Sequence, residues 1–234
     1  MTGLETSSGA AARPALDSAL MLDALARAAA VLWFGLLAWR SLLPRFFADW
    51  AAVSGSDLLS VLRLVNAVCL LGLYLLFIAM ILLRARPIAK SPGFRPRLEA
   101  ALGGFLVYAL PLLPLSPLDI VGQAGSAVLM AGGAAFALFT LAWLGRSFSI
   151  MAEARGVVTS GPYAVVRHPL YLAEGIANFG ACLQFAFLPA LALFAVQSVF
   201  QVRRMLNEEA VLRQVFPDYG AYMQRTARLI PGIW

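Results

Sequence analysis

Long apolar stretches alternate with short polar ones along almost the whole chain. Apolar residues run with few interruptions over 20–43, 60–83, 98–115 and 118–145, and again over 169–204. A transmembrane helix needs about 20 predominantly apolar residues. These stretches approach or exceed that length. The pattern therefore predicts an all-α, polytopic integral membrane protein with five to six transmembrane helices.

The last apolar stretch is interrupted at Pro189, which follows an aromatic pair in "FAFLPA". A C-terminal helical hairpin over about 169–185 and 188–204 fits this pattern, and its first helix is short enough to be re-entrant. Beyond the hairpin, apolar residues at helical spacing predict an amphipathic tail helix that Pro217 ends, and Asp218 is placed to cap a further short helix. We therefore expect the tail to lie outside the hairpin as separate helices.

The same pattern divides the chain into three regions. Residues 1–19 are rich in Ala and Ser and lack the short apolar region and cleavage site of a secretory signal, so we expect a disordered leader. Transmembrane helices 1–4 are expected over 20–145. The C-terminal region, 146–234, holds a loop, the hairpin and the amphipathic tail.

Composition and charge agree with a membrane location. The chain is 61% hydrophobic with only 13% charged residues, and its mean hydropathy is +0.81. Its net charge of +6 would suggest nucleic acid in a soluble protein, but basic loops that contact anionic lipids explain it better. Residues 84–97 carry five basic residues and no acid. If this loop is cytoplasmic, six crossings place both termini in the cytoplasm as well. All of the 18 basic residues except Arg40, Arg45 and Arg63 then lie on the cytoplasmic side. The expected location is a bacterial inner membrane.

Cysteine and histidine content argues against two kinds of site. Cys69 and Cys182 both lie inside apolar segments, which favours neither a disulfide framework nor a zinc site. His168 is the only histidine of the chain. We therefore expect no metal ion bound directly by protein side chains.

Polar residues gather around that histidine in "GPYAVVRHPLYLAEG". Pro169 suits the first position of a helix, which leaves Arg167 and His168 at the helix mouth, where free N–H groups favour an anion. Glu174 follows inside the apolar helix, on the face of Tyr171. A charged group at such a depth costs on the order of 2–3 kcal/mol. It is either paired with Arg167 for structure alone or lines a polar cavity.

A second polar cluster follows the hairpin in "RRMLNEEAVLRQVF". Arg203 and Arg204 are typical of residues that anchor a membrane segment at its end. Glu208 and Glu209 would, taken alone, form part of a solvated helix face.

Taken in order, these motifs resemble a known family. "GPYAVVRHPLYL", followed by "NEEAVLRQVFPDYGAYMQRTARLIPGIW" and preceded by "LGRSFSI", resembles the isoprenylcysteine carboxyl methyltransferases and their relatives, the bacterial phospholipid N-methyltransferases. The resemblance runs from about Leu144 to Trp234. It implies an integral membrane enzyme that binds S-adenosyl-L-methionine without a Rossmann domain, enclosed by the hairpin and tail over 146–234.

The resemblance also implies roles for individual residues. It makes Tyr219 and Tyr222 supporting residues. From the chemistry of methyl transfer we expect Arg167, Glu174 and Glu208 to be catalytic, with Glu174 or His168 as the base if the acceptor is an amine. The resemblance assigns nine residues to the cofactor pocket: Gly161, Pro162, Tyr163, Arg167, His168, Pro169, Tyr171, Glu208 and Glu209. One position departs from the family, which usually has glycine where this chain has Ala173.

The expected methyl acceptor is a lipophilic or lipidated molecule from the bilayer. A prenylcysteine-type carboxylate is preferred; an ethanolamine lipid amine and a small lipophilic thiol are also compatible. Two other hypotheses of function remain open. "RHPLYLAE" also resembles the "RHPNYxGE" stretch of sterol reductases that use a nicotinamide cofactor, with Glu174 at the position of their glutamate. A non-catalytic membrane protein, such as a scaffold or transporter, is the alternative outside enzymes.

Overall fold

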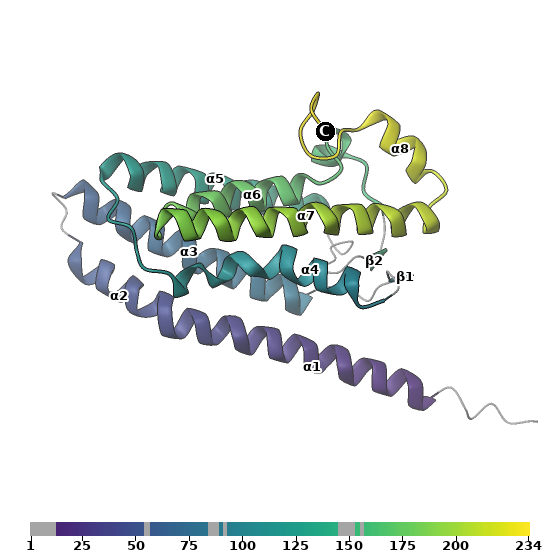
Figure 1. Ribbon diagram of the computed structural model, residues 1–234, viewed down its shortest axis with the longest axis horizontal. Coiled ribbons are helices and arrows are strands. Elements are labelled where there is room, and N and C mark those ends of the chain that lie inside the picture. The colour runs from purple at the N-terminus through teal and green to yellow at the C-terminus, as the bar shows by residue number, and fades with distance from the viewer. Residues whose placement is uncertain (1–12, 54–56, 84–88, 91–92, 145–152, 155–156) are drawn as a thin grey trace, which may run out of the picture.

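The computed structural model describes residues 13–53, 57–83, 89–90, 93–144, 153–154 and 157–234. Its long helices run side by side along one axis of the molecule (Figure 1). Strands β1 (Ala89–Lys90) and β2 (Glu153–Ala154) form one short antiparallel pair. The predicted all-helical architecture is otherwise confirmed.

The first helical segment is bent by a π-helical turn. Helix α1 (Arg13–Leu37) passes into the π-helix η1 (Ala38–Leu42) and then into α2 (Leu43–Ala52). Pro44 is the second residue of α2 and has no N–H to bond to the carbonyl four residues earlier, which accounts for the widened turn. The prediction of a disordered leader over 1–19 is wrong from Arg13 onward, because α1 begins there; residues 1–12 lie outside the described part.

Two long helices match the predicted ranges closely. Helix α3 (Leu58–Leu83) is capped by Asp57, which accepts hydrogen bonds of 3.1 Å from the N–H groups of Leu59 and Ser60. Helix α5 (Ile120–Leu144) begins after Asp119, which accepts a 2.8 Å bond from the Gly122 N–H. Both caps satisfy N–H groups that a helix leaves free at its start.

Three helical stretches of the described residues are long and apolar enough to cross a membrane: Arg27–Ala52, Leu58–Leu76 and Ile120–Leu144. The integral membrane character is thereby supported, and the predicted count of five to six is not confirmed. Helix α4 (Arg95–Phe105) starts three residues earlier than predicted and tightens into the 3-10 helix η2 (Leu106–Leu112), which contains Pro111. Helix α6 (Pro169–Cys182) has 14 residues, about 21 Å, which is shorter than the hydrocarbon core of a bilayer.

The predicted division between hairpin and tail is wrong. Helix α7 (Phe187–Val215) runs without a break for 29 residues, so Glu208 and Glu209 belong to the second hairpin helix. No glycine or proline lies between Pro189 and Pro217, and Arg204, one of the two arginines that suggested a membrane boundary, is paired inside the fold. Helix α8 (Tyr219–Arg225) follows, with Asp218 at its N-cap position but without a side-chain capping bond.

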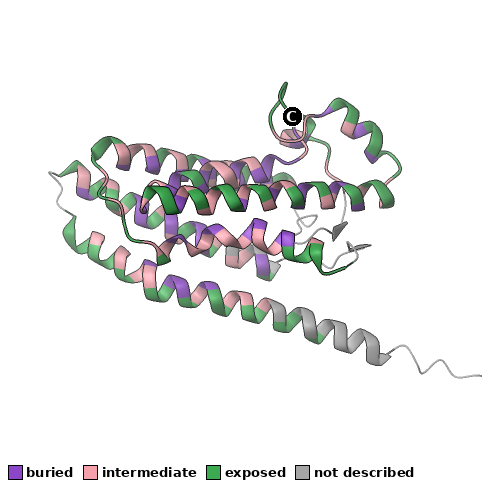
Figure 2. Ribbon diagram, in the orientation of Figure 1, coloured by how far each residue is buried: buried purple, intermediate pink, exposed green. Residues whose placement is uncertain are grey.

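Small residues bring α5 and α6 into close contact. A Cβ atom on Gly133 would lie 2.5 Å from the backbone nitrogen of Ala177, so only glycine fits there. The small residues Ala173, Ala177 and Ala181 of α6 are buried, so they allow close packing of this helix. Buried residues lie on the helix faces that point toward one another, and exposed residues cover the outer faces (Figure 2). This close packing fixes the position of α6 and of the polar residues at its start.

Candidate functional site

A tight turn precedes α6 and depends on one glycine. Gly161 has φ of 59°, and a Cβ there would lie 2.4 Å from the Trp143 ring. It opens the 3-10 helix η4 (Gly161–Ala164), in which Pro162 provides the carbonyl that accepts the N–H groups of Val165 and Val166. Gly161 and Pro162 therefore shape the loop, whereas Tyr163 is buried beneath it.

The segment after this turn pairs with the C-terminal tail. The N–H groups of Arg167 and His168 donate to the carbonyls of Ala227 and Arg228, at 2.8 and 3.0 Å. Pro169 then begins α6, as the sequence predicted. Residues 60 positions apart in the chain thus lie side by side at the mouth of α6.

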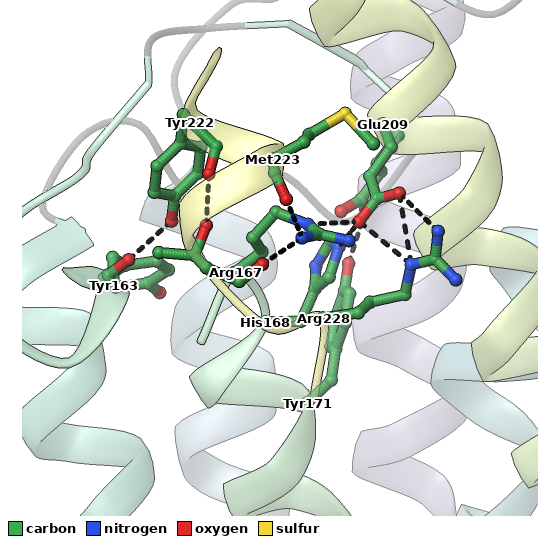
Figure 3. A network of polar contacts seen from close by, with 10 residues as sticks. Tyr163, Arg167, His168, Tyr171, Glu209, Tyr222, Met223 and Arg228 are labelled. Atoms are coloured by element: carbon green, nitrogen blue, oxygen red, sulfur yellow. Dashed lines mark hydrogen bonds and ion pairs between the residues drawn. The ribbon is translucent and has the colours of Figure 1, made fainter. Parts of the chain in front are cut away.

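Glu209 is the centre of a buried cluster of charges (Figure 3). Its carboxylate accepts hydrogen bonds from Arg167 Nε at 2.8 Å and from Arg228 Nε and Nη2 at 2.9–3.1 Å, and lies 3.2 Å from His168 Nε2. Arg167 also donates through Nη1 to the backbone carbonyls of Met223 and Thr226. Arg228 packs over the Trp234 ring at 4.4 Å. One acidic side chain on α7 therefore ties the loop, α6 and the tail together.

The electrostatics of this cluster favour an ionised Glu209. Burial alone would raise the pKa of the carboxyl group, but the hydrogen bonds from His168, Arg228 and Arg167 outweigh it and lower the pKa of Glu209 to about 2. Close by, burial raises the pKa of Tyr222 to about 12. Its protonated hydroxyl donates a 2.6 Å hydrogen bond to the carbonyl of Tyr163.

A second carboxylate lies on the same side of α7. Glu208 accepts a hydrogen bond from the Tyr171 hydroxyl and another from Arg204 Nε at 3.3 Å. The Tyr171 ring stacks on His168, with ring centroids 5.3 Å apart, and the Arg204 guanidinium lies 4.6 Å from the Tyr171 centroid. His168 and Tyr171 therefore connect the Glu208 and Glu209 groups into one assembly.

Two interpretations of single residues are corrected by this geometry. Arg204 is 2% exposed and ion-paired, so it is part of the assembly and not an anchor at the membrane surface, whereas Arg203 is exposed. Glu209 is 3% exposed and Glu208 is paired, so neither belongs to a solvated face. The i, i+4 spacing of Arg204 and Glu208 was a sequence signal for their pairing.

Glu174 lies apart from Arg167. Its carboxylate accepts a 3.0 Å hydrogen bond from Gln201 Nε2 on α7, and Arg167 is engaged by Glu209 instead. Glu174 and Asn178, one helical turn apart on α6, line one small cavity. The structure therefore brings Arg167, His168, Tyr171, Glu208 and Glu209 together, with Glu174 further along the helix.

Sequence reasoning did not single out three further residues of the site. Arg228 was part of a quoted motif without an assigned role, Gln201 was read as part of the apolar hairpin, and Thr226 was not considered. Thr226 donates to the Tyr222 carbonyl at 2.6 Å. The polar residues in an apolar run (Gln197, Gln201, Arg204) were the one signal that could have pointed to a polar face of α7.

An apolar groove of about 330 Å³ adjoins this assembly between α6 and α7. Tyr171 belongs to the assembly and also lines the groove. The groove is also bordered by residues of α5, α6, α7 and the tail: Leu129, Leu172, Gly175, Ile176, Phe179, Phe194, Gln197, Ser198, Gln201, Val202, Met205 and Leu229. Its lining suits an apolar ligand, and its polar side chains are few.

Part of the chain is similar to a known protein family. Residues 123–219 match the model of the phospholipid methyltransferase family, which confirms the resemblance for that part of the chain. The nickel-cobalt-cadmium resistance protein NccN of Alcaligenes xylosoxydans xylosoxydans is 30% identical over 39% of this chain and 46% of its own length. The cobalt-zinc-cadmium resistance protein CzcN of Cupriavidus metallidurans is 38% identical over 32% of this chain and 35% of its own. This chain thus matches less than half of the length of either relative. No solved structure matches it significantly.

Proposed function

We propose that the chain is an integral membrane methyltransferase that uses S-adenosyl-L-methionine and acts on a lipophilic acceptor. The match of residues 123–219 to a methyltransferase family supports the reaction type. The observation that carries the proposal is the buried convergence of Arg167, His168 and Glu209, three of the residues that the resemblance assigns to the cofactor pocket.

The residues present fit the chemistry of this cofactor. It carries a carboxylate, an ammonium, ribose hydroxyls and an adenine ring, and when bound it supplies a methyl group activated by a sulfonium. Arg167 would hold the carboxylate, and Glu208 or Glu209 would accept from the ammonium or the hydroxyls. The Tyr163 hydroxyl is buried and has no hydrogen-bond partner among the described residues, so it has a free donor for a bound molecule.

The apolar groove supports a lipophilic acceptor. It adjoins Tyr171, so a molecule held there would present its polar end to the charged assembly. Holding donor and acceptor in line supplies much of the rate of a displacement reaction. The first candidate acceptor is a prenylcysteine-type carboxylate, which is ionised at pH 7 and needs no general base. An ethanolamine lipid amine is the second candidate. It would need a general base, for which Glu174 or His168 is the candidate, and Glu174 accepts a hydrogen bond from Gln201, which lines the groove.

Calorimetric titration of the detergent-purified protein with S-adenosylhomocysteine tests the proposal, with NADPH as a parallel titrant. We expect binding of S-adenosylhomocysteine alone. Arg167→Ala and Glu208→Ala should each weaken it, whereas Arg225→Ala, an exposed arginine of α8, should not. Binding of NADPH alone would assign the chain to the reductases. If the folded protein binds neither ligand, the hypothesis of a non-catalytic membrane protein is favoured.

A second assay separates the acceptors. Methyl-labelled S-adenosylmethionine is incubated with the protein and either a farnesylated cysteine analogue or phosphatidylethanolamine. A methyl ester releases labelled methanol in base, whereas an N-methyl product is stable. A base-labile product from the cysteine analogue is expected; a base-stable lipid product would move the assignment to the amine.

A further inference from the structure

Another cavity lies beside the start of α2. Figure 1 shows α2 at the end of the bundle opposite α8 and the C-terminus. The cavity has a volume of about 200 Å³. It lies where η1, the end of η2 and the turn between α6 and α7 meet, and its lining is Ser41, Leu42, Arg45, Pro111, Leu113, Leu115 and Phe185. Only Ser41 and Arg45 have polar side chains, so they determine the chemistry of this cavity.

The Arg45 guanidinium is held in place by neighbouring side chains. Nη2 donates to Gln184 Oε1, and the guanidinium carbon lies 5.8 Å from the Phe185 ring centroid. Gln184 is 1% exposed, and its amide nitrogen is fixed by Ser126 Oγ at 3.0 Å and Met130 Sδ at 2.9 Å. The charged group is thus oriented by the protein itself.

One nitrogen of this guanidinium makes no hydrogen bond within the described part of the protein. Arg45 Nη1 is buried and has no hydrogen-bond partner among the described residues. The nearby acid, Asp49, approaches a different nitrogen, Nε, at 3.7 Å. An unpaired buried donor on a charged group is costly. Nη1 is itself enclosed, and the Arg45 guanidinium and the Ser41 hydroxyl belong to the two polar side chains that line the cavity.

The depth of Arg45 fits the headgroup level of a bilayer. Arg27 and Arg45 are 18 positions apart along one helical segment, about 27 Å, close to the thickness of the hydrocarbon core. Trp39, Phe47 and Trp50 are 72%, 61% and 63% exposed around the same end. Exposed aromatic residues of this kind mark the interface of a membrane with water.

We propose that this cavity binds the phosphate of a membrane lipid, with the Arg45 guanidinium and the Ser41 hydroxyl as donors. The shared chemistry is a phosphate oxygen; the apolar lining and the surrounding aromatic residues favour a lipid as its source over a free ion. The site is independent of the proposed methyltransferase activity, because it lies at the opposite end of the bundle.

Native mass spectrometry of the full chain in non-ionic detergent tests this proposal. The protein is titrated with dimyristoyl phosphatidylglycerol, with the diacylglycerol of the same acyl chains, and with inorganic phosphate. We expect a one-to-one phosphatidylglycerol adduct whose affinity falls about tenfold in Arg45→Gln, as expected for loss of a charge-assisted hydrogen bond. Arg40→Gln, an exposed arginine on the same segment, should bind like the unchanged protein.

A second variant covers the case in which Arg45→Gln fails to fold. Ser41→Leu fills the cavity while leaving the bond between Arg45 and Gln184, and it should also lose the adduct. Equal affinity in the unchanged protein and a folded Arg45→Gln or Ser41→Leu would overturn the site. Equal binding of diacylglycerol would overturn the role of phosphate, and binding of inorganic phosphate at the same concentration would overturn the lipid as its source.

Discussion

Replacing Glu209 with glutamine removes the one negative charge that Arg167 and Arg228 share. Both arginines would keep their positive charge in a largely buried place, with side chains that are 8% and 16% exposed. Breaking a buried ion pair from one side costs about 3–5 kcal/mol. The lowered pKa of Glu209 gives a similar figure, since a shift from 4.5 to about 2 corresponds to about 3 kcal/mol of stabilisation of the ionised form. We therefore expect the tail to detach from α6 far more often in Glu209→Gln.

Hydrogen exchange at the mouth of α6 measures that detachment directly. The amides of Arg167 and His168 are protected by the carbonyls of Ala227 and Arg228, so they exchange when the tail leaves. A loss of about 3 kcal/mol corresponds to an increase in exchange of roughly a hundredfold or more. The measurement is peptide-resolved hydrogen exchange of the purified protein in detergent.

Asp218→Asn is the matched control. This acid is exposed, and its side chain makes no capping bond, so exchange of Arg167 and His168 should not change. Unchanged exchange of these two amides in Glu209→Gln would refute the role of Glu209 as the link between α6 and the tail.

The remaining predictions concern pH and two glycines. The pKa of Glu209 is lowered to about 2 in the fold, so the ionised carboxylate stabilises the fold fully above the unfolded pKa of 4.5. This stabilisation is lost as the pH falls toward 2. Hydrogen exchange of the Arg167 and His168 amides, corrected for its intrinsic pH dependence, should therefore rise between pH 4.5 and 2. Gly133→Ala should lower the free energy of unfolding by about 1–3 kcal/mol because its methyl group collides with α6, whereas Gly132→Ala, which faces open space, should be neutral or stabilising in thermal denaturation. Gly161→Ala should weaken S-adenosylhomocysteine binding in calorimetry, because its φ is positive and the Trp143 ring occupies the space of a side chain; unchanged affinity would show that the loop is not part of the pocket.

Local sequence signals predicted the helices that depend on local chemistry. The apolar runs located α3 and α5 to within a few residues, and Pro169 located the start of α6 because proline suits a first helical position. The sequence misplaced the end of the second hairpin helix, because that prediction also relied on local signals alone. A pair of arginines is a local sign of a membrane boundary, but the burial of Arg204 depends on Glu208 and Tyr171, which are tertiary neighbours.

The candidate site shows the same limit. Motif resemblance selected Arg167, His168 and Glu209 as one group, and the structure brings them into contact. It did not reveal that Glu174 would pair with Gln201, since a glutamine in an apolar helix has no sequence pattern that names its partner. Nor could spacing show that Arg228 returns to Glu209, because the turn between α7 and the tail sets that contact.

The pairing of Arg167 with Glu209 and of its backbone with Ala227 has a consequence for synthesis of the protein. The chain is made from its N-terminus, so Arg167 leaves the ribosome 42 residues before Glu209 and 60 before Ala227. During that interval the arginine lacks the carboxylate of Glu209, its partner in the folded protein. The contacts at the mouth of α6 can therefore form only after α7 and the tail have been synthesised.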